Sequence, residues 1–280
     1  MVKELTAILG LVLALSGAAF ARIGPPVPFH VGEKLTYQIF WGPFVVGRAT
    51  LEVTGVEKVD NHDCYHLMAK AKTSGLAEWL FPVDSSIESW LDCRDLFSRK
   101  YREYRSEGKH HASGQTHYDY EHKEVVTANL IKGREKHFPL EQPVQDVVSS
   151  LYFVRAQKLM LDAESTFTVN ADNTNYVVTV RPDLRKEMWV RPVGNIQALR
   201  IEPTPTLRIV SSNKGRMWIW VSDDERRLPL LLNTELKIGN AKLVLFNVAD
   251  TSSAKLTNAL ASSAEAGRAV LDSAKTATGQ

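Results

Sequence analysis

The sequence lacks the short motifs that identify common enzyme classes. It contains no Cys-x-x-Cys pair, no His-Glu-x-x-His zinc motif, no glycine-rich phosphate loop and no Gly-x-Ser-x-Gly nucleophile turn. Each of these motifs places reactive groups or backbone donors in a fixed local geometry. Without them, the sequence favours no catalytic class, and we expect no cofactor.

A large excess of charge of either sign is also absent. The 34 Lys and Arg residues nearly balance the 32 Asp and Glu residues, which leaves a net charge of +2. Binding to nucleic acid depends on a strongly basic surface. We therefore expect no nucleic-acid partner, and 44% hydrophobic with 24% charged residues is typical of a globular protein.

Long apolar runs are missing except at the N-terminus. There Lys3 precedes an apolar run from Leu5 to Leu15, and small residues end at Ala19-Phe20-Ala21. This pattern predicts a signal peptide over residues 1–21, with cleavage near Ala21 and export to the periplasm or the medium. The alternative, an uncleaved anchor, is disfavoured because the run falls short of about 20 residues. No cysteine follows for lipid attachment, and no later segment predicts a transmembrane helix.

Cysteine is scarce, with only Cys64 and Cys93. In an oxidising compartment two thiols commonly form a disulfide. If Asp63–Ser74 and Asp84–Cys93 are antiparallel strands around Trp79, Cys64 lies opposite Cys93 or its neighbour. A disulfide closing a loop of about 30 residues would stabilise the fold by about 3–4 kcal/mol in the chain-entropy model. Two free thiols remain the alternative.

Alternating apolar residues dominate the rest of the chain. Leu35, Tyr37, Ile39 and Trp41 share one face, and Gly42-Pro43 turns the chain into the next alternating run, Gly47–Val53. The same pattern predicts further strands over Tyr65–Thr73, Ser85–Leu91, Ser98–Ser106, Gln115–Tyr120, Val125–Leu130, Ser165–Asn170, Tyr176–Arg181, Lys186–Val190, Asn195–Glu202, Met217–Val221, Leu228–Leu232, Thr234–Ile238 and Ala241–Val248. Consecutive strands predict a mainly β fold, a curled antiparallel meander sheet that forms a partial barrel.

One convincing helix interrupts this pattern near residues 143–161. Pro143 suits a first helical position, and Val144, Val147, Val148, Leu151 and Val154 recur at helical spacing. We expect this helix to pack on the sheet. Asp146 and Arg155 complement the two ends of the helix dipole. Alternatively, Arg155 reaches into the sheet and holds a buried carboxylate.

The predicted domain organisation follows from these elements. After the signal peptide (1–21), a proline-rich lead-in (22–28) precedes one β-rich domain over residues 29–250. Residues 251–280 are rich in Ala and Ser and have few large apolar residues, which predicts a mobile tail with a transient helix. An amphipathic surface helix is the alternative for this tail.

Three segments occur together in this order along the chain. They are Gly32-Glu-Lys-Leu-Thr-Tyr with Gly47-Arg-Ala-Thr-Leu, Asp146-Val-Val-Ser-Ser-Leu-Tyr-Phe-Val-Arg155, and Trp220-Val-Ser-Asp-Asp-Glu-Arg-Arg-Leu-Pro-Leu with Lys237-Ile-Gly-Asn-Ala-Lys-Leu. Together they resemble the domain of unknown function 3108 family of exported bacterial β-rich proteins. The resemblance spans most of residues 29–248. It implies a curled antiparallel sheet, part barrel, with a helix packed against it or into its concavity, and it assigns no catalytic residue.

Histidines supply weak candidates for a metal site, and the carboxylates of Asp223, Asp224 and Glu225 could bind calcium, although a polar hairpin tip explains them as well. His110, His111 and His117 flank Ser113-Gly114, and a turn at that point would bring the imidazoles together. His62, Cys64 and His66 alternate along one predicted strand and form a second set, from which a disulfide would remove the thiolate. The alternative is a solvated hairpin rim, and we commit to no metal.

The tryptophans carry the main functional hypothesis. In a curled sheet, Trp41, Trp79, Trp90, Trp189, Trp218 and Trp220 could line a groove for an acyl chain or an apolar peptide, although core packing explains them too. We therefore expect a non-enzymatic exported protein that binds a lipid, a lipoprotein moiety or an envelope protein. The alternatives are a hydrolase or metal-dependent enzyme acting on cell-wall or surface polymers, and a purely structural adaptor.

Overall fold

The computed structural model describes residues 25–205, 216–236 and 239–251, so the predicted signal peptide and tail lie outside the described residues. Strands make up most of the described chain, which confirms the predicted mainly β class. The first half contains β1 (Glu33–Trp41), β2 (Phe44–Val59), β3 (His62–Thr73), α2 (Leu76–Leu80), β4 (Asp84–Asp92), β5 (Ser98–Glu107), β6 (His110–Asp119), β7 (Glu124–Asn129) and β8 (Arg134–Pro139). The second half contains α3 (Ser149–Ala156), β9 (Ser165–Ala171), β10 (Thr174–Val180), β11 (Pro182–Val190), β12 (Gly194–Ile201), β13 (Thr204–Pro205), β14 (Met217–Ser222), β15 (Pro229–Leu236) and β16 (Gly239–Asp250).

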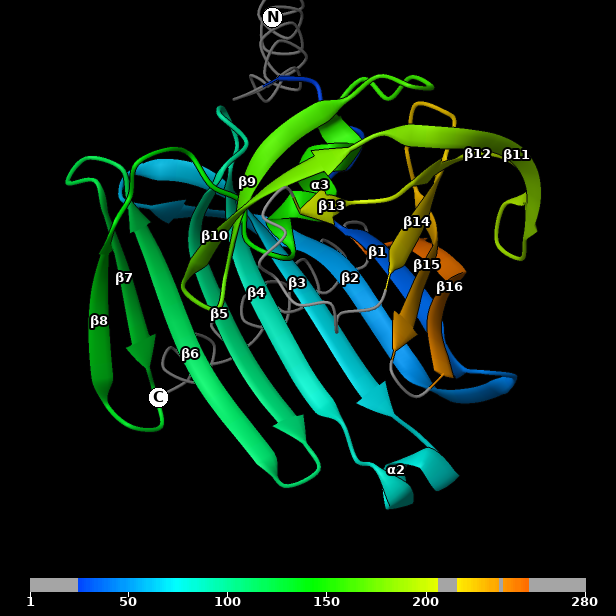
Figure 1. Ribbon diagram of the computed structural model, residues 1–280, viewed down its shortest axis with the longest axis horizontal. Coiled ribbons are helices and arrows are strands. Elements are labelled where there is room, and N and C mark those ends of the chain that lie inside the picture. Colours follow the sequence, from blue (N-terminus) through cyan, green and yellow to red (C-terminus); the bar gives the residue numbers. More distant parts are fainter. Residues whose placement is uncertain (1–24, 206–215, 237–238, 252–280) are drawn as a thin grey trace, which may run out of the picture.

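A large antiparallel sheet forms the body of the molecule. Its 13 strands run in the order β11-β12-β14-β15-β16-β1-β2-β3-β4-β5-β6-β7-β8. The last strand pairs with the first over Glu33↔Asp250 to Trp41↔Ala241, so the two ends of the described sequence meet in mid-sheet. The edge strands β8 and β11 do not pair with each other, and the sheet curls without closing into a barrel (Figure 1).

The curl has identifiable local causes. Bulges shift the register between Thr36 and Tyr37 against β16, and between Val53 and Gly55 against β3. Gly47 allows a close approach between β2 and β3, because a Cβ there would lie 2.3 Å from the carbonyl oxygen of Lys72. These features bend the long strand β2 and make one face of the sheet concave.

A small sheet and α3 lie over this concave face. The small sheet has the order β13-β10-β9, and Gln145 joins it by a parallel bridge to Val169 (Figure 1). Tyr152 of α3 packs among Phe29, Leu67 and Leu91. Val154 packs instead with Val180 and Ile201 on the other side of the helix. The helix therefore packs between the small sheet and the large one. The predicted packing of this helix on the sheet is confirmed.

The helix itself is shorter than the predicted span of 143–161. It covers only Ser149–Ala156. Asp146 Oδ1 accepts hydrogen bonds from the backbone N–H groups of Val148 and Ser149, both at 2.8 Å. This turn starts the helix after Asp146, while Gln145 pairs with the small sheet. The apolar residues before Val148 lie in a segment that precedes the helix, so Pro143 is not a first helical residue.

Two other local predictions need correction. The connection between β3 and β4 contains a second helix, α2, which lacks a buried face. The hairpin of β5 and β6 turns at Gly108, where φ is +59°, and not at Ser113-Gly114, which lie within β6. A glycine adopts this left-handed conformation without the strain of a side chain. An additional strand, β8, follows the last strand predicted in this region.

Candidate ligand-binding site

Two apolar cavities lie between α3 and the concave face. One, of about 370 Å³, is lined by the α3 segment, the small sheet and β12 to β15; its lining includes Val154, Phe167, Val178, Ile201 and Ile219. The other, of about 280 Å³, lies between the α3 segment and strands β1 to β4, β15 and β16. Both share the lining residues Val147, Leu151 and Leu232, so the two cavities are adjacent.

A third cavity, of about 260 Å³, continues the site toward β5, β6 and β7. Its lining is largely polar and includes Glu103, Arg105, Gln115, Thr116, Asn170 and Asp172. It shares Val147 with both apolar cavities and Ile87 with the one beside β4. An apolar region and a polar region thus meet at Val147.

The polar cavity contains an ion pair. Arg105 Nε lies 3.5 Å from Glu103 Oε2, a distance at which it makes an ion pair but no hydrogen bond. The hydroxyl of Tyr101 donates to the same oxygen at 3.0 Å, and burial raises the pKa of this phenol. Because Arg105 Nε is shielded from solvent without a hydrogen-bonding partner, it can donate to a polar group in the cavity.

Asp146 fixes the start of the α3 segment to the sheet. Its Oδ2 accepts hydrogen bonds from Ser89 Oγ at 2.5 Å and Ser98 Oγ at 2.6 Å. Burial raises the pKa of this carboxyl, although these hydroxyl donors oppose the rise. Asp146 therefore does more than complement a helix dipole, since it positions Val147 at the meeting point of the cavities.

Arg155 fixes the other end of α3. Its guanidinium makes a bidentate pair with Glu33, with Nη1–Oε1 at 2.7 Å and Nη2–Oε2 at 2.9 Å. It also donates to the carbonyl oxygens of Pro28, Arg226 and Arg227. Arg155 is 1% exposed, so the alternative prediction is confirmed: this side chain reaches into the sheet and holds a buried carboxylate.

The tryptophans do not line these cavities, contrary to the hypothesis from the sequence. Trp218 and Trp220 alternate with Ile219 and Val221, and it is the latter pair that lines the cavity. Trp90 is buried and stacks on His66 with the ring centroids 4.6 Å apart. Trp41, Trp79 and Trp189 are exposed side chains on β1, α2 and β11. The strand pattern alone could not tell which face of each strand would be concave.

The histidines do not converge either. His110 and His111 lie beside the β5–β6 turn, whereas His117 is farther along β6 and binds Asp60 through Nε2 at 2.6 Å. In the second set, His66 lies between Glu57 and Glu88, on opposite sides of its ring. In the described ranges, no group of three or more His, Cys, Asp and Glu residues has an arrangement that could hold a metal.

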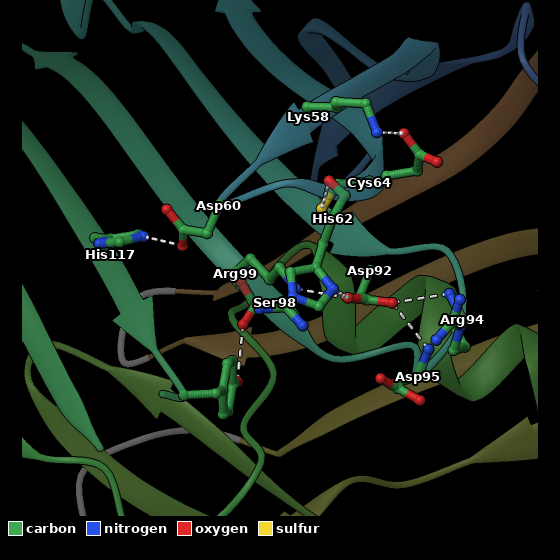
Figure 2. A network of polar contacts seen from close by, with 12 residues as sticks. Lys58, Asp60, His62, Cys64, Asp92, Arg94, Asp95, Ser98, Arg99 and His117 are labelled. Carbon is green, nitrogen blue, oxygen red and sulfur yellow. Dashed lines mark hydrogen bonds and ion pairs between the residues drawn. The ribbon is translucent and has the colours of Figure 1, made fainter. Parts of the chain in front are cut away.

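A polar network surrounds Asp92 where β4 joins β5 (Figure 2). Asp92 Oδ2 binds Arg99 Nε at 2.5 Å and lies 3.7 Å from His62 Nδ1. Burial works against ionisation of Asp92, but hydrogen bonds from the Asp95 and Arg94 backbone and from Arg99 lower its pKa overall. Both carboxylate oxygens are occupied, so the network holds the β4–β5 connection in place.

Cys64 lies close to this network without forming a catalytic centre. Its Sγ contacts the carbonyl oxygen of His62, and burial raises the pKa of the thiol to about 12. A nucleophilic cysteine needs the opposite shift. The residues Cys64, His62 and Asp92 thus do not form an activated triad.

The structure confirms the predicted register of the cysteines. Cys64 pairs with Asp92, the neighbour of Cys93, and both thiols are buried. They are free in the structure, and burial also raises the pKa of Cys93 to about 12. The disulfide remains a prediction for the exported protein.

Sequence reasoning missed the residues that line the site. Val147 and Leu151 belonged to the predicted apolar stripe of the helix, but the stripe did not indicate a space beside it. Glu103 and Arg105 alternate with Arg102 and Tyr104, so charged residues occur on both faces of β5. This charge on both faces was the available sign that the concave side of β5 is not an ordinary apolar core.

The fold and the cavities define a class of protein, an open curled β-sheet with a helix and a small sheet over its concave face and cavities between them. The chain belongs to the DUF3108 family, described as a protein of unknown function, whose model matches residues 36–245. A comparison of this chain with the curated proteins found no significant match. No helix within the described ranges is long and apolar enough to cross a membrane.

Several solved structures are similar to this chain at very low sequence identity. A β-barrel-like protein of family DUF1849 from Brucella abortus is 9% identical, with a TM-score of 0.50 over 78% of this chain and 97% of that chain. A candidate lipoprotein from Parabacteroides distasonis is 7% identical, with a TM-score of 0.34 over 79% and 98%. A candidate exported protein with a YmcC-like fold from Bacteroides fragilis is 8% identical, with a TM-score of 0.30 over 79% and 97%. At these identities the similarity concerns the fold alone.

Proposed function

We propose that this protein is exported and binds an amphiphilic lipid in the cavities beneath α3. The acyl chain would occupy the two apolar cavities, and the polar head would lie beside Glu103 and Arg105. Export, cleavage near Ala21 and a periplasmic or secreted location follow from the N-terminal pattern. The role is one of binding or carrying and requires no activated nucleophile.

The adjacency of the three cavities around Val147 is the observation that carries this proposal. Binding pockets commonly have volumes of about 300–1,000 Å³, with apolar walls and a few polar groups that orient the ligand. Here the apolar cavities measure about 370 and 280 Å³, and a polar one adjoins them at Val147. A purely apolar ligand would leave the polar cavity unused, whereas an amphiphile matches both regions.

Leu151 offers a direct test because it lines both apolar cavities. Replacing Leu151 with Trp fills the space needed by the acyl chain, and we expect the affinity for a fluorescent fatty acid to fall about tenfold or more. Leu184→Trp on the edge strand β11 is the matched control and should bind as the unaltered protein does. Native mass spectrometry of the exported protein should show a bound lipid that Leu151→Trp loses. Equal binding by all three proteins would contradict the proposal.

Arg105 tests the position of the polar head. We expect Arg105→Gln to weaken binding of a fatty acid while leaving binding of the alcohol of equal chain length nearly unchanged, because only the carboxylate gains from the guanidinium. Arg185→Gln is the control, since Arg185 has similar exposure but lies on the edge strand β11, outside the lining of the three cavities. A parallel loss for acid and alcohol would place the head elsewhere. Isothermal titration calorimetry gives both affinities.

A further inference from the structure

One end of the large sheet presents a row of exposed apolar side chains. The connections β1–β2, β3–β4, β5–β6 and β7–β8 all lie at this end, because neighbouring strands are antiparallel. Figure 1 shows it as the lower edge, with α2 projecting from it. We call it the apolar end. Its exposed large hydrophobic residues are Trp41, Phe44, Val45, Leu76, Trp79, Leu80, Phe81, Leu130 and Ile131.

The exposure of α2 is extreme for apolar residues. Leu76 is 83% exposed, Trp79 is 82% exposed, and the helix has no buried residue. Such side chains contribute nothing to the core, and contiguous exposed apolar groups commonly mark an interaction site. The exposed apolar side chains of α2 therefore indicate that this helix contacts an apolar partner.

Backbone contacts hold the projecting segment in place. The N–H of Ser74 donates to the carbonyl of Val46, and the N–H of Gly108 donates to that of Pro82. Val83 N–H also donates to Thr73 Oγ1 at 2.8 Å. The β3–β4 connection is thus tied to its neighbours on both sides, and its apolar side chains project from an ordered support.

The exposed apolar groups form a row along the end of the sheet and do not line a pocket. Strands in a sheet lie about 4.8 Å apart, so the tips of the β3–β4 and β7–β8 hairpins, four strand positions apart, are separated by about 20 Å. Between them the β5–β6 turn carries Lys109, and Lys132 follows Ile131 at the β7–β8 turn; both lysines are exposed. Separate apolar tips with adjacent cations suit a wide planar surface better than a single protein pocket.

The distribution of charge indicates how such a surface would be approached. At the apolar end, residues 40–45, 72–85, 106–111, 128–135 and 239–242 contain five Lys or Arg residues and four Asp or Glu residues. At the opposite end, residues 30–34, 58–63, 91–99, 118–125 and 248–250 contain nine acidic and five basic residues. An anionic surface would repel the opposite end and accept the apolar end.

We infer that the apolar end docks on a phospholipid membrane by inserting its hairpin tips into the interface between headgroups and acyl chains. Tryptophan, phenylalanine and leucine favour this interface, where aromatic rings can span the apolar and the polar layers. Lys109 and Lys132 would contact anionic headgroups. This docking is independent of the proposed ligand site, although it would bring the protein to a source of lipid.

Vesicle flotation tests this inference with the mature chain, Arg22 to Gln280, so that the leader does not contribute binding. We expect flotation with phosphatidylcholine–phosphatidylglycerol vesicles and a partition coefficient reduced about tenfold or more by the double change Trp79→Ser and Leu80→Ser. Trp189→Ser, which removes an exposed tryptophan from edge strand β11, is the control and should retain binding. Circular dichroism verifies that each variant is folded.

Each outcome decides the question. Loss of flotation only in the α2 variant, with quenching of tryptophan fluorescence by brominated lipid that Trp79→Ser reduces, supports membrane docking. No flotation of the unaltered chain overturns it, as does equal flotation of all variants. Self-association that the α2 variant abolishes, without vesicle binding, would also overturn it and assign the apolar end to a second copy of this chain. Replacing Leu151 with Trp should leave flotation unchanged, which separates this inference from the proposed ligand site.

Discussion

The two halves of the concave face differ in the polarity of their inward side chains. Beside β1, β2, β3, β15 and β16, inward residues such as Leu51, Ala69, Leu232 and Leu243 form an apolar wall. Beside β5, β6 and β7, the corresponding residues are Tyr101, Glu103, Arg105, Thr116 and Thr127. The Glu103–Arg105 pair is partly exposed, so water as well as polar groups can reach this wall. The same sheet thus builds an apolar wall and a polar wall around one site.

Each half has its own anchor for the α3 segment. Arg155 ties the helix to Glu33 of β1 in the apolar half, and Asp146 ties its start to Ser89 and Ser98 of β4 and β5 beside the polar half. Both anchors are buried charges or polar groups with several hydrogen bonds. The comparison indicates that the site depends on the position of α3 over both walls, which can be tested by removing each anchor.

Removing the Arg155 anchor should have the largest effect. We expect Arg155→Ala to lower the free energy of unfolding by about 3–5 kcal/mol, because Glu33 would remain buried without its partner. Arg226→Ala, which removes an exposed arginine paired with Asp224, should cost about 1 kcal/mol or less. Urea denaturation followed by circular dichroism measures both. A loss for Arg155→Ala as small as that of the control would mean that α3 is held mainly by its apolar contacts.

The two cysteines can be used to test whether a disulfide links neighbouring parts of the sheet. A disulfide in the exported protein would join β3 to the β4–β5 connection and stabilise the fold by about 3–4 kcal/mol, so reduction should lower the unfolding midpoint. Mass spectrometry of the alkylated exported chain should find no free thiol. If two thiols are instead found after denaturation, the bridge is absent, and the native thiols should react slowly at pH 8 because burial raises the pKa of each to about 12.

Removing the Asp146 anchor should have a smaller effect. We expect Asp146→Ala to destabilise the protein by about 2–3 kcal/mol, since Ser89, Ser98 and the start of α3 lose an acceptor. Asp84→Ala, at an exposed ion pair with Lys72, should change stability by about 1 kcal/mol or less. Equal effects of the two changes would show that Asp146 does not position the segment.

The pH dependence of this anchor has a defined sign. Burial raises the pKa of Asp146 in the folded state, so the folded protein binds a proton more readily than the unfolded chain does. The contribution of Asp146 is therefore fully present below its unfolded pKa of about 3.9 and decreases as the pH rises through the folded value. The destabilisation by Asp146→Ala should accordingly be larger at pH 4 than at pH 7.

The predictable part of the fold rests on local alternation. Leu35, Tyr37 and Ile39 identified β1, and the alternating runs Thr234–Ile238 and Ala241–Val248 predicted strands in the region where β15 pairs with β16. The hairpins follow because each strand pairs with its neighbour in the sequence through a short turn. The predicted histidine cluster was wrong because the predicted position of the β5–β6 hairpin turn was wrong. The turn lies at Gly108 and not at Ser113-Gly114, which places His117 far along the strand from His110.

The sequence by itself determined the mainly β class, the order of most strands and the family, since these depend on side-chain periodicity and on motifs within short segments. Tertiary structure alone decided that β16 pairs with β1, that the small sheet and α3 enclose the cavities, and that Trp79 projects while Leu151 lines the site. Alternation assigns residues to two faces but does not say which face becomes concave. That choice depends on bulges, on the close approach at Gly47 and on the anchors at Asp146 and Arg155, which join residues distant in the sequence.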